Sequence, residues 1–164
     1  MRFTKIKKTK EDKIYLEYQE KNSHEEYDNF MMECADAPLP DFGRSLNALA
    51  PDIGTLCELP KNSWPRITAK SVSLSYSGEK EVMGAVISGA MELLNSNSPL
   101  NLNTPFKASG SYNDGDPDPR QVMEYQTKVR IEKLCDEAKR YLRGERLQGD
   151  LFKKDEAKEK TEKK

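Results

Sequence analysis

Short turns separate most of the apolar segments of this 164-residue chain, and their length limits how the segments can be arranged. Residues 14–18 and 71–76 alternate apolar and polar side chains, which is the pattern of strands with one buried face. Residues 27–34 are a further predicted strand, with Phe30, Met32 and Cys34 on one face and Tyr27 and Met31 on the other. The turns between predicted strands hold only three to five residues, as at 22–24 and 95–99. Because turns this short join antiparallel neighbours, the sequence predicts a largely antiparallel sheet.

Residues 82–94 and 100–102 add to the predicted strands. The first of these segments is almost wholly apolar or small, so its periodicity does not separate helix from strand. Gly84 and Gly89 would each disfavour a helix by about 1 kcal/mol relative to alanine. We therefore predict a strand that is buried on both faces, followed by a turn and one short strand.

Residues 42–50 instead repeat their apolar side chains every three or four positions, as a helix does. Asp41 is predicted to accept a hydrogen bond from the free amides of the first turn. Pro51 is expected to interrupt this helix or to start a second short one that closes before Pro60.

The longest helical pattern runs from Pro119 to Leu142. Asp118 is predicted as its N-cap, because an acidic residue followed by proline and, two positions on, by glutamine is typical of a helix start. Gly144 is expected to end the helix in a left-handed conformation.

These elements predict an α+β fold, with a largely antiparallel sheet of about six strands and two main helices packed on one face. Residues 1–143 are expected to form a single domain and residues 144–152 a tail. Residues 153–164 hold no apolar side chain larger than alanine, so we expect a disordered charged end.

Composition argues against several classes of protein. Net charge is −1, which excludes a globally basic nucleic-acid binder but not a local basic patch. The three cysteines are far apart, so we expect reduced thiols rather than a disulfide framework or a zinc site. The sequence shows neither a signal peptide nor a membrane-spanning stretch, so a soluble, cytoplasmic protein is expected.

The sequence offers little for catalysis. His24 is the single histidine and lies in a polar turn, and no nucleotide-binding, hydrolase or metalloprotease motif occurs. The acidic residues 113–118 lack the pattern of a calcium loop and are interpreted as a linker with a helix cap. We therefore predict a protein that is not an enzyme and has no cofactor or metal.

Basic residues are concentrated near the N-terminus, where Lys5, Lys7 and Lys8 could contact the backbone of single-stranded DNA. The more common role of such lysines is to protect an edge strand from pairing. Likewise, the alternating serines at 71–77 are more often a solvated sheet face than a ligand surface.

Beyond the last helix, Gln148-Gly149-Asp150-Leu151-Phe152 places two large apolar side chains in a polar tail. Adjacent apolar residues on a tether are typical of a short docking peptide. This pentapeptide resembles the motif by which bacterial polymerases and repair proteins dock on the DNA sliding clamp. The resemblance implies that Leu151 and Phe152 enter the cleft of the clamp while Gln148 hydrogen-bonds beside it; Asp150 also matches, whereas Gly149 departs from the preferred leucine.

Residues 65–152, from VSLSYSG through MGAVISGAMELLNSNSPLNLNTPFK to YLRGERLQGDLF, resemble small proteins of tailed bacteriophages and prophages. The resemblance implies a non-enzymatic accessory protein in a bacterial host that docks on the sliding clamp and modulates replication or recombination. Two alternatives stay open, namely a single-stranded nucleic-acid-binding accessory protein and an inhibitor or ligand-sequestering protein directed against a host defence.

Overall fold

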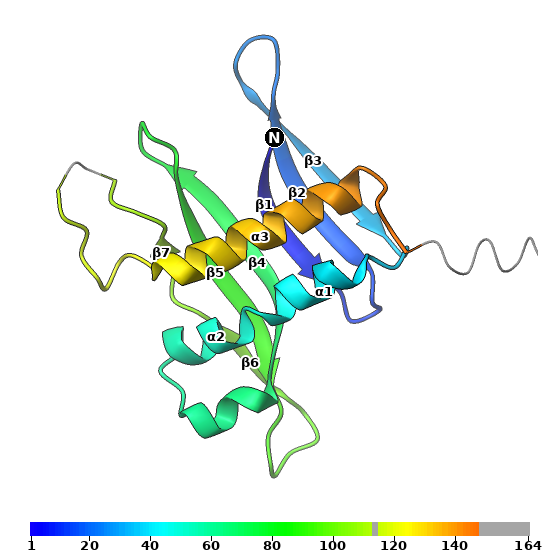
Figure 1. Cartoon of the computed structure of the whole chain (residues 1–164), viewed down its shortest axis with the longest axis vertical. Helices are drawn as coiled ribbons and strands as arrows, with labels where there is room; N and C mark the ends of the chain where they lie inside the picture. The colour runs from blue at the N-terminus through cyan, green and yellow to red at the C-terminus, as the bar shows by residue number, and fades with distance from the viewer. Residues whose placement is uncertain (113–114, 148–164) are drawn as a thin grey trace, which may run out of the picture.

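The computed structural model describes residues 1–112 and 115–147 and shows one antiparallel sheet with helices on one face (Figure 1). Its strands are β1 (Arg2–Lys8), β2 (Ile14–Lys21), β3 (Tyr27–Cys34), β4 (Ile67–Ser77), β5 (Val82–Met91), β6 (Leu100–Asn103) and β7 (Lys107–Ala108). Its helices are α1 (Pro40–Asn47), α2 (Ala50–Leu56) and α3 (Tyr125–Leu142), with a 3-10 helix, η1 (Lys61–Arg66), before β4. The predicted α+β class is confirmed.

The strands are ordered β3-β2-β1-β4-β5-β6, every neighbouring pair is antiparallel, and β7 also pairs with β5. Hairpins connect β1 to β2 to β3, and another connects β4 to β5. The segment containing α1, α2 and η1 crosses from β3 to β4 and brings β4 beside β1. That central pairing is short, since it covers only residues 5–7 against residues 71–73.

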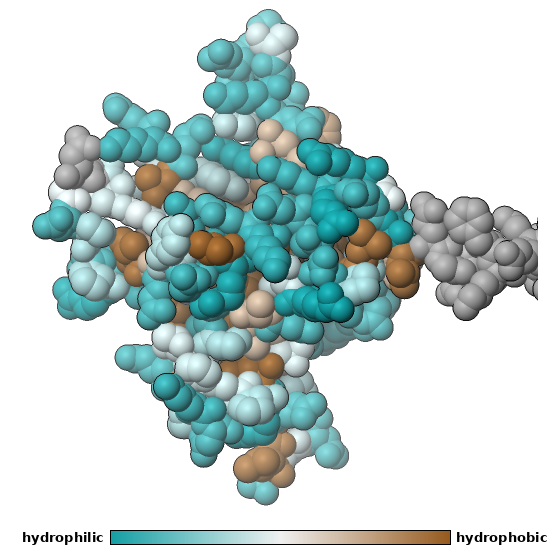
Figure 2. Space-filling model, viewed as in Figure 1, coloured by the Kyte–Doolittle hydropathy of each residue, from teal (hydrophilic) through white to brown (hydrophobic). Residues whose placement is uncertain are grey.

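The hydrophobic core lies between the sheet and the helices, and α3 crosses the strands diagonally in Figure 1. Figure 2 shows the outer surface of this helix layer as mainly hydrophilic with separate hydrophobic spots, because the apolar sides of the helices face the sheet. Among the described residues, no helix covers the opposite face of the sheet. We call it the open face, and it carries Lys5, Lys7, Ser71, Ser73, Ser75 and Ser88.

Two β-bulges decide which side chains of β1 and β4 reach the core. Phe3 and Ile6 are both buried although they are three residues apart, and the register of β1 against β2 shifts between them. In β4, Ala69 and Val72 are both buried, and the register against β5 shifts just after Ala69. Because a bulge adds one residue without a direct partner, Lys70 stands outside the ladder.

The prediction that residues 82–94 form a strand buried on both faces is only partly right. The strand ends at Met91, and its helix-facing side chains are buried from Ala85 onward. On the open face, Val86 and Ser88 are half-buried because no second layer of helices packs there.

The predicted cap of the first helix is wrong. The helix begins at Pro40, its N-cap is Leu39, and the Asp41 carboxylate forms no capping hydrogen bond. Instead, Asp41 accepts a hydrogen bond from Arg44 at 2.9 Å. Proline has a fixed φ and lacks an N–H group, so it suits the first position of a helix and starts α1 before Asp41 is reached. As predicted, Pro51 lies in the first turn of the short helix α2.

The predicted start of the long helix at Asp118 is also wrong. The helix begins at Tyr125, and Asp118 accepts a hydrogen bond from the backbone N–H of Arg120 in a turn. Residues 119–121 form a turn, and the residues after it are held extended because Met123 donates a backbone hydrogen bond to Ala108 at 2.8 Å and buries its side chain. Tertiary pairing therefore overrides the local helix signal.

The end of α3 agrees with the prediction. The helix stops at Leu142, and Gly144 has a φ of +93°, in the region that glycine adopts without steric cost. The chain then returns to the end of β3, where Leu147 donates a backbone hydrogen bond to Ala37 at 2.9 Å. The predicted disordered end at 153–164 lies outside the described residues.

Candidate nucleic-acid interface

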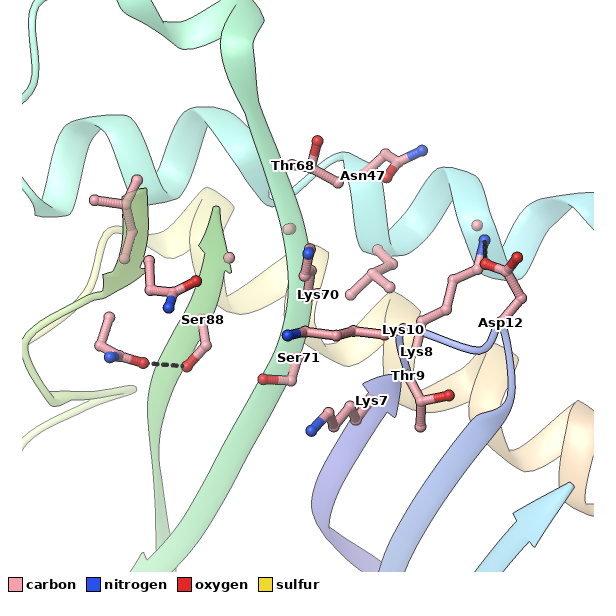
Figure 3. Close-up of a pocket in the computed structure, with 17 residues that line it drawn as sticks. Lys7, Lys8, Thr9, Lys10, Asp12, Asn47, Thr68, Lys70, Ser71 and Ser88 are labelled. Atoms are coloured by element: carbon pink, nitrogen blue, oxygen red, sulfur yellow. Dashed lines mark hydrogen bonds and ion pairs between the residues drawn. The ribbon is translucent and has the colours of Figure 1, made fainter. Parts of the chain in front are cut away.

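A cavity of about 540 Å³ opens where β1 and β4 separate. Lys7 and Ser71 form the last pair between these strands. Beyond it, β1 turns away into the hairpin toward β2, whereas β4 continues toward η1, so a gap is left between them (Figure 3). We call this cavity the lysine groove; it is lined by Lys7, Lys8, Lys10 and Lys70, with Ser71, Ser88 and Asn103 among its other polar residues.

The β1–β2 hairpin supplies three of the lysines, and local hydrogen bonds hold its turn. The backbone N–H of Asp12 donates to the Thr9 carbonyl at 3.1 Å, and Lys13 donates to the Thr9 hydroxyl at 3.1 Å. Asp12 has a φ of 59°, a conformation that aspartate tolerates better than most residues. The turn therefore holds Lys8 and Lys10 beside the end of β4.

The bulge in β4 supplies the fourth lysine. Ala69 faces the core and Ser71 the open face, so the extra residue between them lets Lys70 leave the ladder toward the hairpin. In Figure 3 the Lys10 side chain extends across the groove toward β4, the strand that carries Lys70. Two separate segments of the chain thus bring positive charge to one place.

The charges of the groove are poorly balanced. Asp12 is the only acid among its lining residues, and it lies 3.7 Å from the Lys8 ammonium in an exposed pair. An exposed pair of this kind contributes little to stability and leaves the lysine available. Lys7, Lys10 and Lys70 form no ion pair with any other described residue.

Polar groups continue from the groove across the sheet. Cross-strand pairing places Lys7, Ser71, Ser88 and Asn103 in one row over β1, β4, β5 and β6. The Ser88 hydroxyl donates to the Asn103 side-chain oxygen at 2.7 Å. Hydroxyl and amide groups beside ammonium groups can hydrogen-bond phosphate oxygens and base edges. The arrangement suits an extended polyanion.

The structure brings the predicted lysines together. Lys7 and Lys8 line the groove, and Lys5 lies beside it on the open face, paired with Ser73. Lys10 belongs to the same basic N-terminal segment but was not singled out as a contact, and Lys70 was missed. A signal for Lys70 was present, because the apolar positions change from odd to even numbers between residues 69 and 72, as a bulge requires.

The predicted docking residues Gln148, Asp150, Leu151 and Phe152 lie outside the described residues. The last described residue, Leu147, leads directly into them. Its hydrogen bond to Ala37 fixes the point from which the motif departs.

A second polar cluster is structural. Asp52 is buried between α2 and α3, and its carboxylate accepts hydrogen bonds from Thr127 and, twice, from Arg130, all at 2.7 Å. The hydrogen bond and charge of Asp52 raise the pKa of the Arg130 guanidinium. Because both carboxylate oxygens are engaged, this cluster holds two helices together and leaves no free acid or base.

Thiols and metal ligands form no other site in the part of the chain that the structure describes. The three cysteines are free, and burial raises the pKa of Cys135 to about 12, which keeps it as an unreactive thiol. His24 is exposed in its turn. No group of three or more histidine, cysteine, aspartate or glutamate side chains is placed to hold a metal ion.

The comparisons do not assign a family. Neither protein-family models, nor curated proteins, nor solved structures gave a match to this chain. None of the described helices is long and apolar enough to cross a membrane. The lysine groove and the open face are therefore the features of the molecule that bear on its function.

Proposed function

We propose that this protein is a nucleic-acid-binding accessory protein that holds phosphates of its ligand in the lysine groove. The observation that supports this is the meeting of four lysines with a single carboxylate, in a chain whose net charge is −1. Such local concentration of one charge, without a matching partner, is the electrostatic footprint of a polyanion site.

Binding releases the cations condensed on the nucleic acid, and this release supplies most of the free energy of a phosphate contact. Lys7, Lys10 and Lys70 reach the ligand from two sides of the groove, while Ser71 and Asn103 donate hydrogen bonds to it. These contacts position a backbone and carry no sequence information. The proposed activity is binding rather than catalysis.

Fluorescence anisotropy of a labelled thymidine oligonucleotide tests this proposal. Lys7→Glu and Lys70→Glu should each weaken binding by about ten-fold at moderate salt, because each turns an attraction into a repulsion. Lys133→Glu is the matched control, since it makes the same change on the exposed side of α3. Equal affinity for all four proteins, or no binding by the wild type, would reject the proposal.

The second candidate is docking on a bacterial sliding clamp through residues 148–152. The observation that favours it is the place where the motif begins. Ile14 pairs with Lys8 on one side and with Cys34 on the other, so the end of β3 near Leu147 and the groove lie toward the same ends of these strands. A phage or prophage accessory protein built this way would bring its nucleic-acid site to the clamp, or would compete with host proteins for it.

Titration of bacterial clamp with the full chain and with a chain ending at Leu147 tests the second candidate. The full chain should bind with micromolar affinity, which is typical of short docking peptides. Leu151→Ala together with Phe152→Ala should abolish binding, as should the truncation. Binding that survives both changes would reject docking by this motif without bearing on the lysine groove.

A further inference from the structure

Phe106 presents an aromatic ring on the open face. The side chain is 48% exposed, whereas the core rings of Phe3 and Phe42 are each 1% exposed. A Cβ atom on Gly84 would lie 2.1 Å from the Phe106 Cζ, so the tip of the ring occupies the space that a side chain at residue 84 would take. Gly84 thereby anchors the ring while leaving much of its surface in solvent.

The ring lies on the same face as the lysine groove. Gly84 pairs with Ser75, Val86 with Ser73 and Ser88 with Ser71, and all of these residues face away from the helices. Ser88 lines the groove, so about 13 Å of strand β5 separates the groove from Phe106. Lys5 pairs with Ser73 midway along this path.

The path between the two ends is mostly polar and is partly accessible, although Ser71 at the groove is only 8% exposed. Ser73 and Ser75 are exposed, and Val86 and Ser88 are half-buried. Hydroxyl groups here can hydrogen-bond phosphates or base edges without reading sequence. The open face thus joins a positively charged site at one end to an aromatic surface at the other.

A second aromatic residue on the open face fits this role less well. Tyr15 lies opposite Lys7, but its hydroxyl donates to Glu17 and lies 3.0 Å from the Met31 sulfur. The hydrogen bond to Glu17 is the main cause of the raised pKa of Tyr15. Glu33 is the cross-strand neighbour of Tyr15, so two carboxylates lie beside this ring and its hydroxyl is already engaged.

We propose that the ligand is single-stranded nucleic acid and that one of its bases stacks on Phe106 while Lys5, Lys7 and Lys70 hold its phosphates. This inference rests on the proposed function and adds the class of substrate. Stacking tolerates any sequence because every base has a π-face. The bases of a duplex are stacked on one another inside it, so a duplex offers the groove its phosphates but offers Phe106 no base.

Two measurements on the full chain test the inference. Phe106→Ala and Phe106→Leu should each weaken binding of a thymidine oligonucleotide by about ten-fold, with little change in its dependence on salt. Phe106→Tyr should retain the affinity. The wild type should bind a duplex of the same length more weakly than it binds the single strand. The wild type and Phe106→Leu should bind this duplex with equal affinity.

Fluorescence gives a readout that a merely structural role would not produce. In Phe106→Trp, the emission of the new tryptophan should be quenched when the oligonucleotide saturates the protein, because a base stacks on the indole. The wild type supplies the background, since Trp64 donates its indole N–H to the Leu59 carbonyl and packs on Gly54 beneath α2.

The outcomes separate the two proposals. Salt-sensitive binding that depends on Lys7 and Lys70, but is equal for single strand and duplex and indifferent to Phe106, would overturn only the stacking inference. Absence of salt-sensitive binding by the wild type would overturn the proposed function and the stacking inference together. Unchanged emission of Phe106→Trp at saturation would also overturn stacking.

Discussion

Lys7 and Ser71 are the last residues that β1 and β4 pair before the two strands separate. This pair lies where the two halves of the sheet meet and borders the lysine groove. On one side of it the chain turns into the β1–β2 hairpin, and on the other the bulge at Lys70 moves that lysine out of the ladder. The register that joins β1 to β4 therefore also brings the lysines of the groove together.

Asp12 offers a test in which a substitution should improve binding. Asp12→Asn removes the only carboxylate in the groove and frees Lys8, while asparagine accepts the positive φ of this turn. We expect affinity for a single-stranded oligonucleotide to rise by about two- to five-fold at low salt. Glu11→Gln, in the neighbouring pair with Lys13, is the control and should change affinity less. Weaker binding by Asp12→Asn would contradict the assignment of the groove.

Asp52 should matter for stability and not for binding. Asp52→Asn leaves Arg130 with a neutral partner in a site where the carboxylate is 4% exposed. We expect the free energy of unfolding to fall by about 1.5 to 3 kcal/mol, measured in urea. Asp41→Asn removes an exposed pair with Arg44 and should cost less than about 1 kcal/mol. Equal losses of stability from the two substitutions would show that the Asp52 cluster stabilises the fold no more than an exposed ion pair does.

The two glycines of β5 should respond differently to alanine. At Gly89 a Cβ would lie 2.3 Å from the backbone oxygen of Thr68, which cannot move without disturbing β4. At Gly84 it would meet the half-exposed ring of Phe106, which can rotate away. We expect Gly89→Ala to lower the free energy of unfolding by about 1 to 3 kcal/mol. Gly84→Ala should cost less stability but weaken single-strand binding, and the reverse pattern would count against this reading of Phe106.

Cys135 should make the fold sensitive to alkaline pH. Burial raises the pKa of its thiol from 9.0 to about 12, so above pH 9 the unfolded chain loses this proton while the folded chain keeps it. The contribution of this thiol to the free energy of unfolding is therefore fully present below pH 9. It is lost as pH rises toward 12, at up to about 1.4 kcal/mol per pH unit. Urea unfolding at pH 8 and pH 10 should show a smaller loss for Cys135→Ser than for the wild type. An equal loss in both would exclude this thiol as the cause.

Much of the fold could be predicted because the local pattern and the tertiary structure agree. Residues 14–18 alternate because one side faces the core and the other the open face, and short turns leave no arrangement except antiparallel neighbours. Gly144 was predictable because a helix end needs a residue that accepts positive φ. In these places a few adjacent residues determine the outcome.

The predictions were wrong or incomplete where residues distant in sequence determine the local structure. Asp118 carries a strong helix-start pattern, yet the pairing of Met123 with Ala108 delays the helix by several residues. Lys70 joins the groove only because a bulge turns it, and Phe106 reaches the open face only because Gly84 leaves room. The groove was predicted only in part for this reason. Lys7 and Lys8 are neighbours in sequence, but Lys70, which lines the groove from β4, is far from them in sequence.

The dependence of oligonucleotide affinity on salt tests the central claim most directly. If about three or four lysine–phosphate contacts form, a plot of the logarithm of the binding constant against that of salt concentration should have a slope of about −2 to −3 for single strands. The double substitution Lys7→Gln and Lys70→Gln should make this slope shallower by about 1.4, whereas Lys133→Gln should leave it unchanged. A slope near zero for the wild type, or the same slope for the double variant, would contradict the claim that the lysine groove binds nucleic acid.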